Sequence, residues 1–270
     1  MFGYVTMKHS SVILLMTVLY CQPGLWQPGT AYTLPEGRWE LGLFQPARWG
    51  QGQTREISFY KFSSIFMPNV NIKQKWSETE SLILSTNHTF TYPTPLLKKL
   101  QSPLGMDAGE PNMFALISPE FDIPPMVIIT NTLLVSKPFD QDRILTGKIG
   151  ISIALGSSDL AEQTSIDLPL VYHRLAVLYN GWSLRLGIDM NGPMRKKLSY
   201  LVDGDVLLIP GMKGNMAIEH KGMLTWDRSS RFQVSLGYKL IYGVYPDGYP
   251  NKNVTRVHIL PLVDFQWARD

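Results

Sequence analysis

Histidine is the residue type in this chain best suited to acid–base chemistry near neutral pH. His88, His173, His220 and His258 are spread over separate stretches of the sequence. A hydrolase needs one of them beside a nucleophile, and the hydroxyl that adjoins His88 belongs to Thr89. The sequence contains no HExxH, GxSxG or glycine-rich phosphate-binding motif. We therefore expect a non-enzymatic protein without catalytic residues, metal or cofactor, and we retain as an alternative a membrane-embedded lipid hydrolase that uses His88 or His173.

A second set of reactive side chains consists of ionisable residues in the middle of alternating, strand-like stretches. On the inner face of a closed sheet these charges would line a lumen, in which positive charges outnumber negative ones. They would form either a self-neutralised plug or a cation-rich path that favours anions. Asp203-Gly204-Asp205 resembles a fragment of a calcium loop but lacks the later ligands, so it is interpreted as a turn that breaks the strand predicted over residues 198–212. The predicted lumen residues are Lys148, Arg174, Arg185, Asp189, Glu219, Lys221, Lys239, Arg256 and Asp264.

The elements that must position these charges are clearest in the stretch Leu168–Met190. From Trp182 onward, apolar residues alternate strictly with small or charged ones, which is the pattern of a strand with one apolar face. Asn180-Gly181 tolerates the positive φ of a tight turn. We therefore predict a β-hairpin, with Arg185 and Asp189 on the polar side of its second strand.

Similar runs recur along the chain, and no later segment has the roughly 18 consecutive apolar residues of a helical membrane span. The sequence thus predicts an all-β fold, namely a single antiparallel up-and-down transmembrane β-barrel of about 12 strands, with a range of about 10 to 14. Residues 46–53 are predicted to form a Gly-rich loop. The predicted strands cover residues 38–44, 57–62, 67–76, 82–92, 126–136, 144–155, 168–179, 182–190, 198–212, 215–226, 232–244 and 254–267.

Residues 93–125 interrupt this rhythm. Thr94–Leu100 has proline at its first turn and is predicted to form a short helix, while the rest is rich in Gly and Pro. A connection of this length is typical of a lid, a plug or a binding segment, or it simply rests on the barrel rim. Counting the predicted strands from a periplasmic N-terminus places the segment in the periplasm.

The N-terminus has the features of a secretory signal peptide. Lys8 precedes a short apolar run, and small residues follow up to Ala31. We predict a signal peptide over residues 1–31 and a barrel over residues 32–270. Cys21, the single cysteine, excludes an internal disulfide, and Tyr20 before it is unsuited to a lipoprotein signal.

The composition agrees with an exported barrel. The hydrophobic fraction is 44%, the charged fraction is 17%, and the net charge of +3 is spread along the chain, which argues against nucleic-acid binding. A soluble exported sandwich would also alternate. The barrel is favoured because aromatic residues stand near strand ends and because Phe265-Gln266-Trp267 lies close to the C-terminus.

Two stretches, residues 32–44 (YTLPEGRWELGLF) and 93–100 (PTPLLKKL), resemble uncharacterised Gram-negative outer-membrane β-barrel proteins. The resemblance implies an outer-membrane location and a barrel architecture, and it carries over no catalytic residue. Three functional hypotheses remain open. The first is a porin-like barrel that passes or binds small solutes in its charged lumen. The second is the lipid hydrolase, and the third is a structural barrel whose segment 93–125 docks a periplasmic partner. Surrounding outer-membrane lipid is expected in each case.

Overall fold

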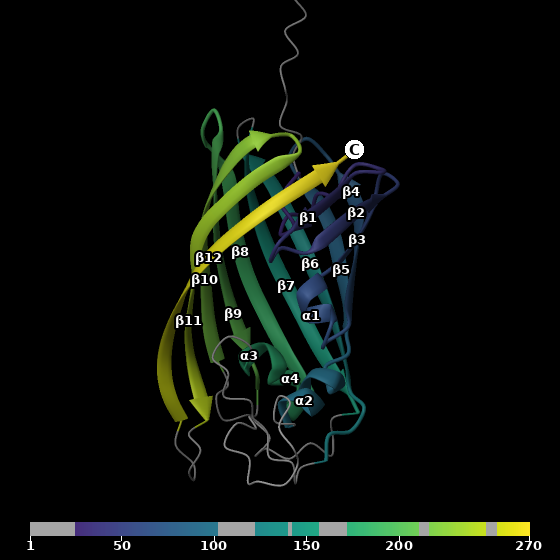
Figure 1. The fold of residues 1–270 in the computed structure, drawn as a ribbon, viewed down its shortest axis with the longest axis vertical. Coiled ribbons are helices and arrows are strands. Elements are labelled where there is room, and N and C mark those ends of the chain that lie inside the picture. The colour runs from purple at the N-terminus through teal and green to yellow at the C-terminus, as the bar shows by residue number, and fades with distance from the viewer. Residues whose placement is uncertain (1–24, 102–121, 140–141, 157–171, 211–215, 247–252) are drawn as a thin grey trace, which may run out of the picture.

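The computed structural model describes residues 25–101, 122–139, 142–156, 172–210, 216–246 and 253–270. Within these residues, twelve antiparallel strands form one closed barrel (Figure 1), which confirms the predicted fold class. Each strand pairs with its neighbours in sequence, and β1 closes the barrel on β12. The strands are β1 (Trp39–Gly42), β2 (Ala47–Gln51), β3 (Arg55–Phe59), β4 (Asn69–Glu78), β5 (Ile83–Thr91), β6 (Val127–Phe139), β7 (Arg143–Leu155), β8 (Trp182–Arg195), β9 (Leu198–Leu208), β10 (Met216–Ser229), β11 (Phe232–Pro246) and β12 (Asn253–Arg269).

The alternation in the sequence sorts side chains between the two faces of the barrel wall. On β7, Lys148 is 5% exposed and its neighbour Ile149 is 58% exposed. Since successive strand residues point to opposite faces, the charged set lies inside and the apolar set outside. Many large apolar side chains, including Trp49, Leu236 and Ile259, are accordingly exposed on the exterior.

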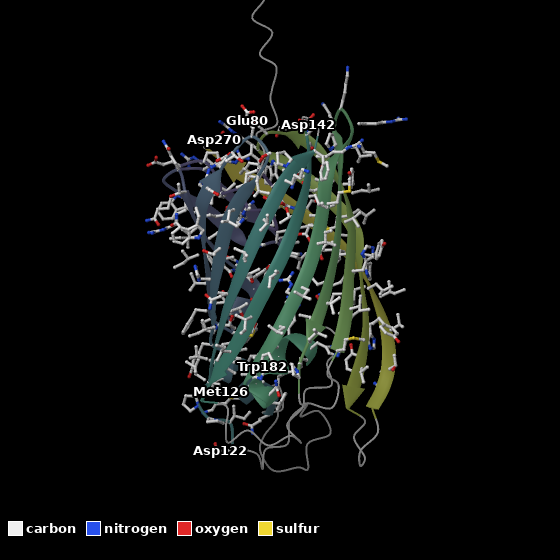
Figure 2. All side chains as sticks on the ribbon, turned by 180° about the vertical axis from the view of Figure 1, so that it is seen from behind. Glu80, Asp122, Met126, Asp142, Trp182 and Asp270 are labelled. Atoms are coloured by element: carbon white, nitrogen blue, oxygen red, sulfur yellow. The ribbon has the colours of Figure 1, made fainter. Side chains whose placement is uncertain are left out.

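The two ends of the barrel differ. The connections at residues 52–54, 79–82, 196–197 and 230–231 are short and lie at one end, together with the C-terminus. Figure 2 places Glu80, Asp142 and Asp270 at this end, and Met126 and Trp182 at the other. The described parts of the two long connections, residues 92–101, 122–126 and 172–181, lie at that second end. Among the described residues, no helix has the length and apolar character needed to cross a membrane.

The first half of the predicted hairpin is wrong. In place of a strand before Asn180, the chain forms two short helices, α3 (Tyr172–Leu175) and α4 (Val177–Asn180). Gly181 has φ of +80° and caps α4 in the left-handed conformation, where its amide donates to the carbonyl oxygen of Val177 at 2.8 Å. A positive φ at glycine serves a helix C-terminus as well as a hairpin turn, so this signal alone could not distinguish them.

The predicted loop at residues 46–53 contains a strand instead, β2. This strand is short, and Gly50 and Gly52 made the stretch resemble a loop in the sequence. Five strands therefore precede residue 93, which moves the flanks of segment 93–125 to the end opposite the termini. The helix predicted at Thr94–Leu100 is confirmed as α2 (Thr94–Gln101), whereas residues 102–121 lie outside the described part of the chain.

The first three strands are much shorter than the rest, with four or five residues each. The hairpins of β1, β2 and β3 therefore form the wall only near the end that carries the termini (Figure 1). On β12, only Gln266–Arg269 pair with β1, whereas Asn253–Trp267 pair with β11. The helix α1 (Lys61–Ser64) follows β3, and Asn69 at the start of β4 donates to the hydroxyls of Ser63 and Ser64 at 3.0 and 2.9 Å.

Candidate functional site

The barrel interior holds a cluster of ion pairs at mid-height, in which the carboxylates and Lys148 are buried. Lys148 on β7 contacts three carboxylates, with its Nζ 2.5 Å from Asp189, 3.1 Å from Asp205 and 3.6 Å from Asp203. Asp203 also lies 3.4 Å from the Nζ of Lys221 on β10. Lys148 of β7 thus pairs with carboxylates from both β8 and β9.

The same cluster continues across the lumen to β10 and β11. Arg185 on β8 lies 2.5 Å from Asp205. Glu219 on β10 accepts from Lys239 on β11 at 2.9 Å and from the Arg174 guanidinium. Arg174 belongs to α3, so its predicted position on a strand is wrong although it still faces the charges.

We call this set the central ionic cluster, and it contains five cations and four carboxylates. The near balance of charge is what allows so many ionised groups to remain inside the barrel. Seven of its members were predicted as lumen residues, whereas Asp203 and Asp205 were assigned to a turn. The cluster comprises Lys148, Arg174, Arg185, Lys221, Lys239, Asp189, Asp203, Asp205 and Glu219.

Both aspartates lie in the middle of β9, where they face Gly187 and Asp189 of β8 in the pairing register. The missed signal was their period of two. Asp203 and Asp205 stand on one side, while Val202 and Val206 stand on the other.

Two predicted lumen residues stay outside the central ionic cluster. Asp264 on β12 is 2% exposed and accepts from the backbone amides of Phe44 and Gln45 at 2.8 and 3.2 Å. It therefore fixes the turn between β1 and β2. Arg256 on β12 is exposed, and the described residues supply it with no ion-pair partner.

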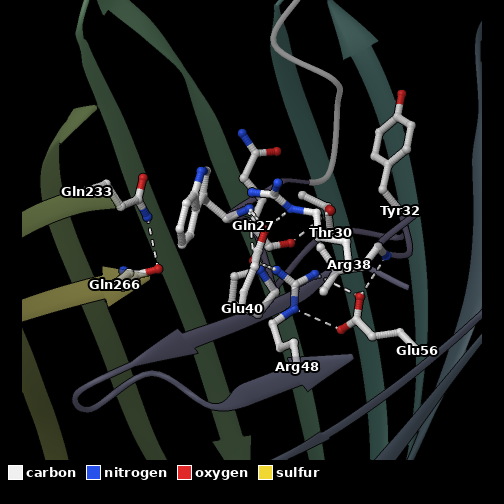
Figure 3. Close-up of polar contacts among 12 residues, drawn as sticks. Gln27, Thr30, Tyr32, Arg38, Glu40, Arg48, Glu56, Gln233 and Gln266 are labelled. Atoms are coloured by element: carbon white, nitrogen blue, oxygen red, sulfur yellow. Dashed lines mark hydrogen bonds and ion pairs between the residues drawn. The ribbon is translucent and has the colours of Figure 1, made fainter. Parts of the chain in front are cut away.

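A second layer of buried charges lies nearer the termini (Figure 3). Arg48 on β2 is 2.8 Å from both Glu40 and Glu56, and each of these three side chains is less than 5% exposed. Arg38 lies 3.1 Å from Glu40, and Lys73 lies 3.6 Å from Glu56. We call these five residues the terminal ionic ladder.

The ladder holds the chain that precedes β1 inside the barrel. The amide of Leu34 donates to Glu56 at 3.1 Å, and Lys73 donates to the carbonyl oxygen of Tyr32 at 3.1 Å. Deeper in, the amide of Ala31 donates to the hydroxyl of Ser136 at 2.8 Å, and Ala31 is fully buried. The predicted signal peptide ends at this residue. Its first 24 residues lie outside the described chain, and the cleavage site stays a prediction.

A cavity of about 590 Å³ lies between the two ionic layers and the barrel rim. Trp26 and Tyr32 line it from the N-terminal segment, and Lys148 and Asp189 line it at mid-height. Three cations of the rim, Arg143, Arg195 and Lys196, also face it, and the described residues give them no ion-pair partner. The lining includes six cations and four carboxylates: Arg143, Lys148, Arg185, Arg195, Lys196 and Lys221 against Asp142, Asp189, Asp203 and Asp227.

The opposite end of the lumen is filled by apolar side chains from the helices. Leu97 of α2 and Leu178 of α4 are at most 1% exposed and pack with Met126 and Ile128 in one cluster. The His173 ring of α3 packs edge-on against Tyr245, with ring centroids 4.7 Å apart.

His173 is placed here by its contacts with β11. Its Nε2–H donates to the carbonyl oxygen of Val244 at 2.9 Å, and Gly243 leaves the space that the ring occupies. Burial lowers the pKa of this imidazole, although the Val244 carbonyl and Glu219 act in the opposite direction.

The remaining histidines occupy unrelated surroundings. His88 lies on the exterior of β5, where it contacts Thr86 and Asn131 instead of Thr89. Thr89 bonds to Asn71 on the inner side of the wall. His220 on β10 lies 3.0 Å from the Tyr238 hydroxyl. Within the described residues no group of three or more His, Cys, Asp or Glu side chains is arranged to hold a metal ion.

Neither protein-family models nor curated proteins match the chain. Among solved structures, it is similar to OmpT folded in vitro, an outer membrane protein of Vibrio cholerae. The TM-score is 0.42, the identity is 6%, and the match covers 85% of this chain and 64% of that chain. The chain thus spans less than two thirds of the length of that structure, and a likeness at this level carries no information on function.

Proposed function

We propose that the protein is an integral outer-membrane β-barrel. The proposal rests on a closed sheet whose exterior is apolar, because a closed sheet satisfies every backbone group in lipid without water. Trp226 and Trp267 stand near the last residues of β10 and β12, and Trp182 lies at the other end of the barrel (Figure 2), so aromatic residues suit both interfaces of a bilayer. Short turns in such barrels face the periplasm, so the termini are periplasmic and α2 faces outward.

Within this barrel, the function that the geometry supports best is binding of a small anionic solute from the periplasmic end. The cavity of about 590 Å³ is the observation that carries it. At its rim, Arg143, Arg195 and Lys196 present positive charge without ion-pair partners among the described residues. An anion would gain attraction there without first breaking a buried pair.

An open channel is the less suitable function for this interior. The central ionic cluster crosses the lumen from β7 to β11, and the carboxylates of the cluster already neutralise most of its cations. Beyond it, the apolar packing of α2, α3 and α4 fills the far end. The cavity is therefore closed at its inner end, and a solute that enters it from the periplasmic end would leave by that end.

A titration and a conductance measurement test this proposal together. Citrate serves as the anionic probe and spermidine as the cationic one, both titrated calorimetrically into the full chain in detergent. Replacing Arg143, Arg195 and Lys196 together by glutamine should weaken citrate binding by roughly tenfold or more, since each lost charge contributes up to about 1 kcal/mol at an exposed site. The matched control replaces Lys98 and Lys99 of α2, at the opposite end, by glutamine.

Equal affinity for the two probes, or equal loss in both variants, would overturn the anion pocket. The same protein in a planar bilayer should give no discrete conductance steps. Regular steps that persist in purified protein would instead establish an open channel.

Segment 93–125 remains the proposed docking site for a partner. Its flanks at α2 and Ile123 lie at the end opposite the termini, so we now assign that partner to the outer surface of the cell. Cross-linking from a cysteine placed at exposed Lys98 on intact cells would detect it.

A further inference from the structure

A row of polar side chains lies on the otherwise apolar exterior of β4, β5 and β6. The Thr86 hydroxyl is 3.0 Å from His88 Nε2, and His88 Nδ1 is 2.6 Å from Asn131 Oδ1. On the other side, the indole N–H of Trp76 donates to the Thr86 oxygen at 2.8 Å. The four groups form one continuous chain of hydrogen bonds across three strands.

The hydrogen bonds fit one consistent arrangement of protons. Asn131 Oδ1 can only accept, so His88 Nδ1 carries the proton and Nε2 is the acceptor. Thr86 must then donate its hydroxyl proton to Nε2. A hydroxyl held against a neutral imidazole, which a third group orients from its other nitrogen, is the arrangement that activates a nucleophile in acyl transfer.

The surroundings suit an acyl chain. Beside Thr86 and Asn131 lies a depression of about 270 Å³, lined chiefly by Leu133, Ile149, Ile151 and Leu184. Polar atoms therefore stand at one edge of an apolar hollow on the outer surface of the wall. A lipid whose ester meets Thr86 could lay its hydrocarbon against these side chains.

The depth in the proposed membrane also fits an ester. His88 precedes the end of β5 by three residues, and Asn131 follows the start of β6 by four. With about 3.3 Å per residue and a strand tilt of about 40°, the row lies about 10 Å from the end of the wall that carries Trp182. This places the row in the leaflet near that end, close to the level where acyl chains join their headgroups.

We propose that Thr86, His88 and Asn131 form a lipid-facing site that hydrolyses acyl esters of membrane lipids. Thr86 Oγ1 attacks the ester carbonyl carbon while His88 Nε2 takes its proton, and the alcohol leaves with that proton as the ester C–O bond breaks. Water, deprotonated by His88, then attacks the acyl–threonine ester, which releases a carboxylic acid and restores Thr86. Asn131 orients the imidazole, and the Trp76 N–H, which donates to Thr86 Oγ1, holds the hydroxyl in place. The site rests on the proposed membrane location of the exterior and is independent of the interior pocket.

The test measures lysophospholipid and free fatty acid released from mixed micelles and vesicles of phosphatidylethanolamine and phosphatidylglycerol by the purified full chain. Thr86→Val and His88→Gln should each lower the rate by roughly 100-fold or more, and Thr86→Ser should retain it. Two matched controls, Thr89→Val on the inner face of β5 and His220→Gln on β10, should stay within about twofold of the original rate. A long-chain fluorophosphonate should attach to the peptide that carries residue 86.

Retained heat-modifiable gel mobility shows for each variant that the barrel is folded. A folded, membrane-inserted wild-type protein without lipid turnover would overturn this site while leaving the barrel proposal intact. Full activity in Thr86→Val, or attachment of the phosphonate at another residue, would overturn it equally. If Thr86→Val does not fold, Thr86→Ser and the site of phosphonate attachment decide the question.

Discussion

Arg48 shows why the interior charges matter for stability. Its guanidinium is 2% exposed and contacts Glu40 and Glu56, which are equally buried. Removing the cation leaves two carboxylates inside the barrel without their main partner. We expect Arg48→Met to lower the free energy of unfolding by about 3–5 kcal/mol, measured from urea titrations of the detergent-folded protein.

Lys75 provides the matched comparison for Arg48. It pairs with Glu78 at 2.5 Å, but the Glu78 side chain is 47% exposed, so solvent screens the pair. Lys75→Met should change the free energy of unfolding by less than about 1 kcal/mol. If the two variants lose the same stability, the buried ladder does not hold the barrel together in the way described.

His173 makes stability depend on pH. Its pKa in the folded protein is lower than the ordinary value of 6.5, chiefly because the ring is buried, so protonation favours the unfolded chain. This contribution is fully present above about pH 6.5 and is lost as the pH falls below it. His173→Gln keeps a donor for the Val244 carbonyl and should flatten the fall in stability between about pH 7 and 5. Parallel pH curves for the two proteins would exclude His173 as the source.

Among the elements, the long strands were predictable and the short ones were not. The strand predicted at residues 232–244 is β11, because seven apolar residues alternate there without interruption. β2 has only five residues, two of them inward-facing, so no period could be recognised. α3 and α4 escaped prediction because Asn180-Gly181 suits either a turn or a helix end. Their position inside the barrel depends on contacts with β11 that are remote in the sequence.

The site residues were predictable to the extent that their strands were. Lys148 and Arg185 stand in clear alternating runs, and both lie in the central ionic cluster. The partners of each charge depend on the register between strands, which sequence alone does not fix. The contact of His88 with Asn131 is such a cross-strand pair, separated by 43 residues. Thr86, two positions before His88, was not predicted as its partner, since the hydroxyl that adjoins His88 belongs to Thr89.

Gly50 lies where β2 contacts the chain that precedes β1 inside the barrel. A Cβ on this residue would lie 2.0 Å from the carbonyl oxygen of Pro35 and 2.7 Å from that of Leu34. Gly50→Ala should therefore push the chain that precedes β1 away from β2. This would increase the exposure of Arg38, which is 4% exposed in the folded protein. Trypsin should then cleave after Arg38 in the variant and leave this bond intact in the original protein.

Gly147 on β7 is the control for this substitution, because a Cβ there would meet nothing within 4 Å. Gly147→Ala should keep the protection of Arg38. Equal cleavage in both variants would mean that Gly50 does not position the segment.

For the whole molecule, the strand number was predicted correctly through two errors that cancel. The prediction omitted β2 and counted residues 168–179 as a strand, and the total remained 12. The end of the barrel assigned to segment 93–125 still changes, because the omitted strand β2 precedes this segment whereas residues 168–179 follow it. Closure of the barrel between β1 and β12, at Leu41 opposite Trp267, could not have been derived from local patterns.

The central claim is that these strands form a closed barrel in an outer membrane. It is tested most directly by gel mobility of the protein in an isolated outer-membrane fraction, with and without boiling. We predict that the protein is found in that fraction and migrates faster unboiled than boiled, because a hydrogen-bonded barrel of this kind resists detergent until heated. Recovery in the soluble periplasmic fraction, with a mobility that heating leaves unchanged, would contradict the account.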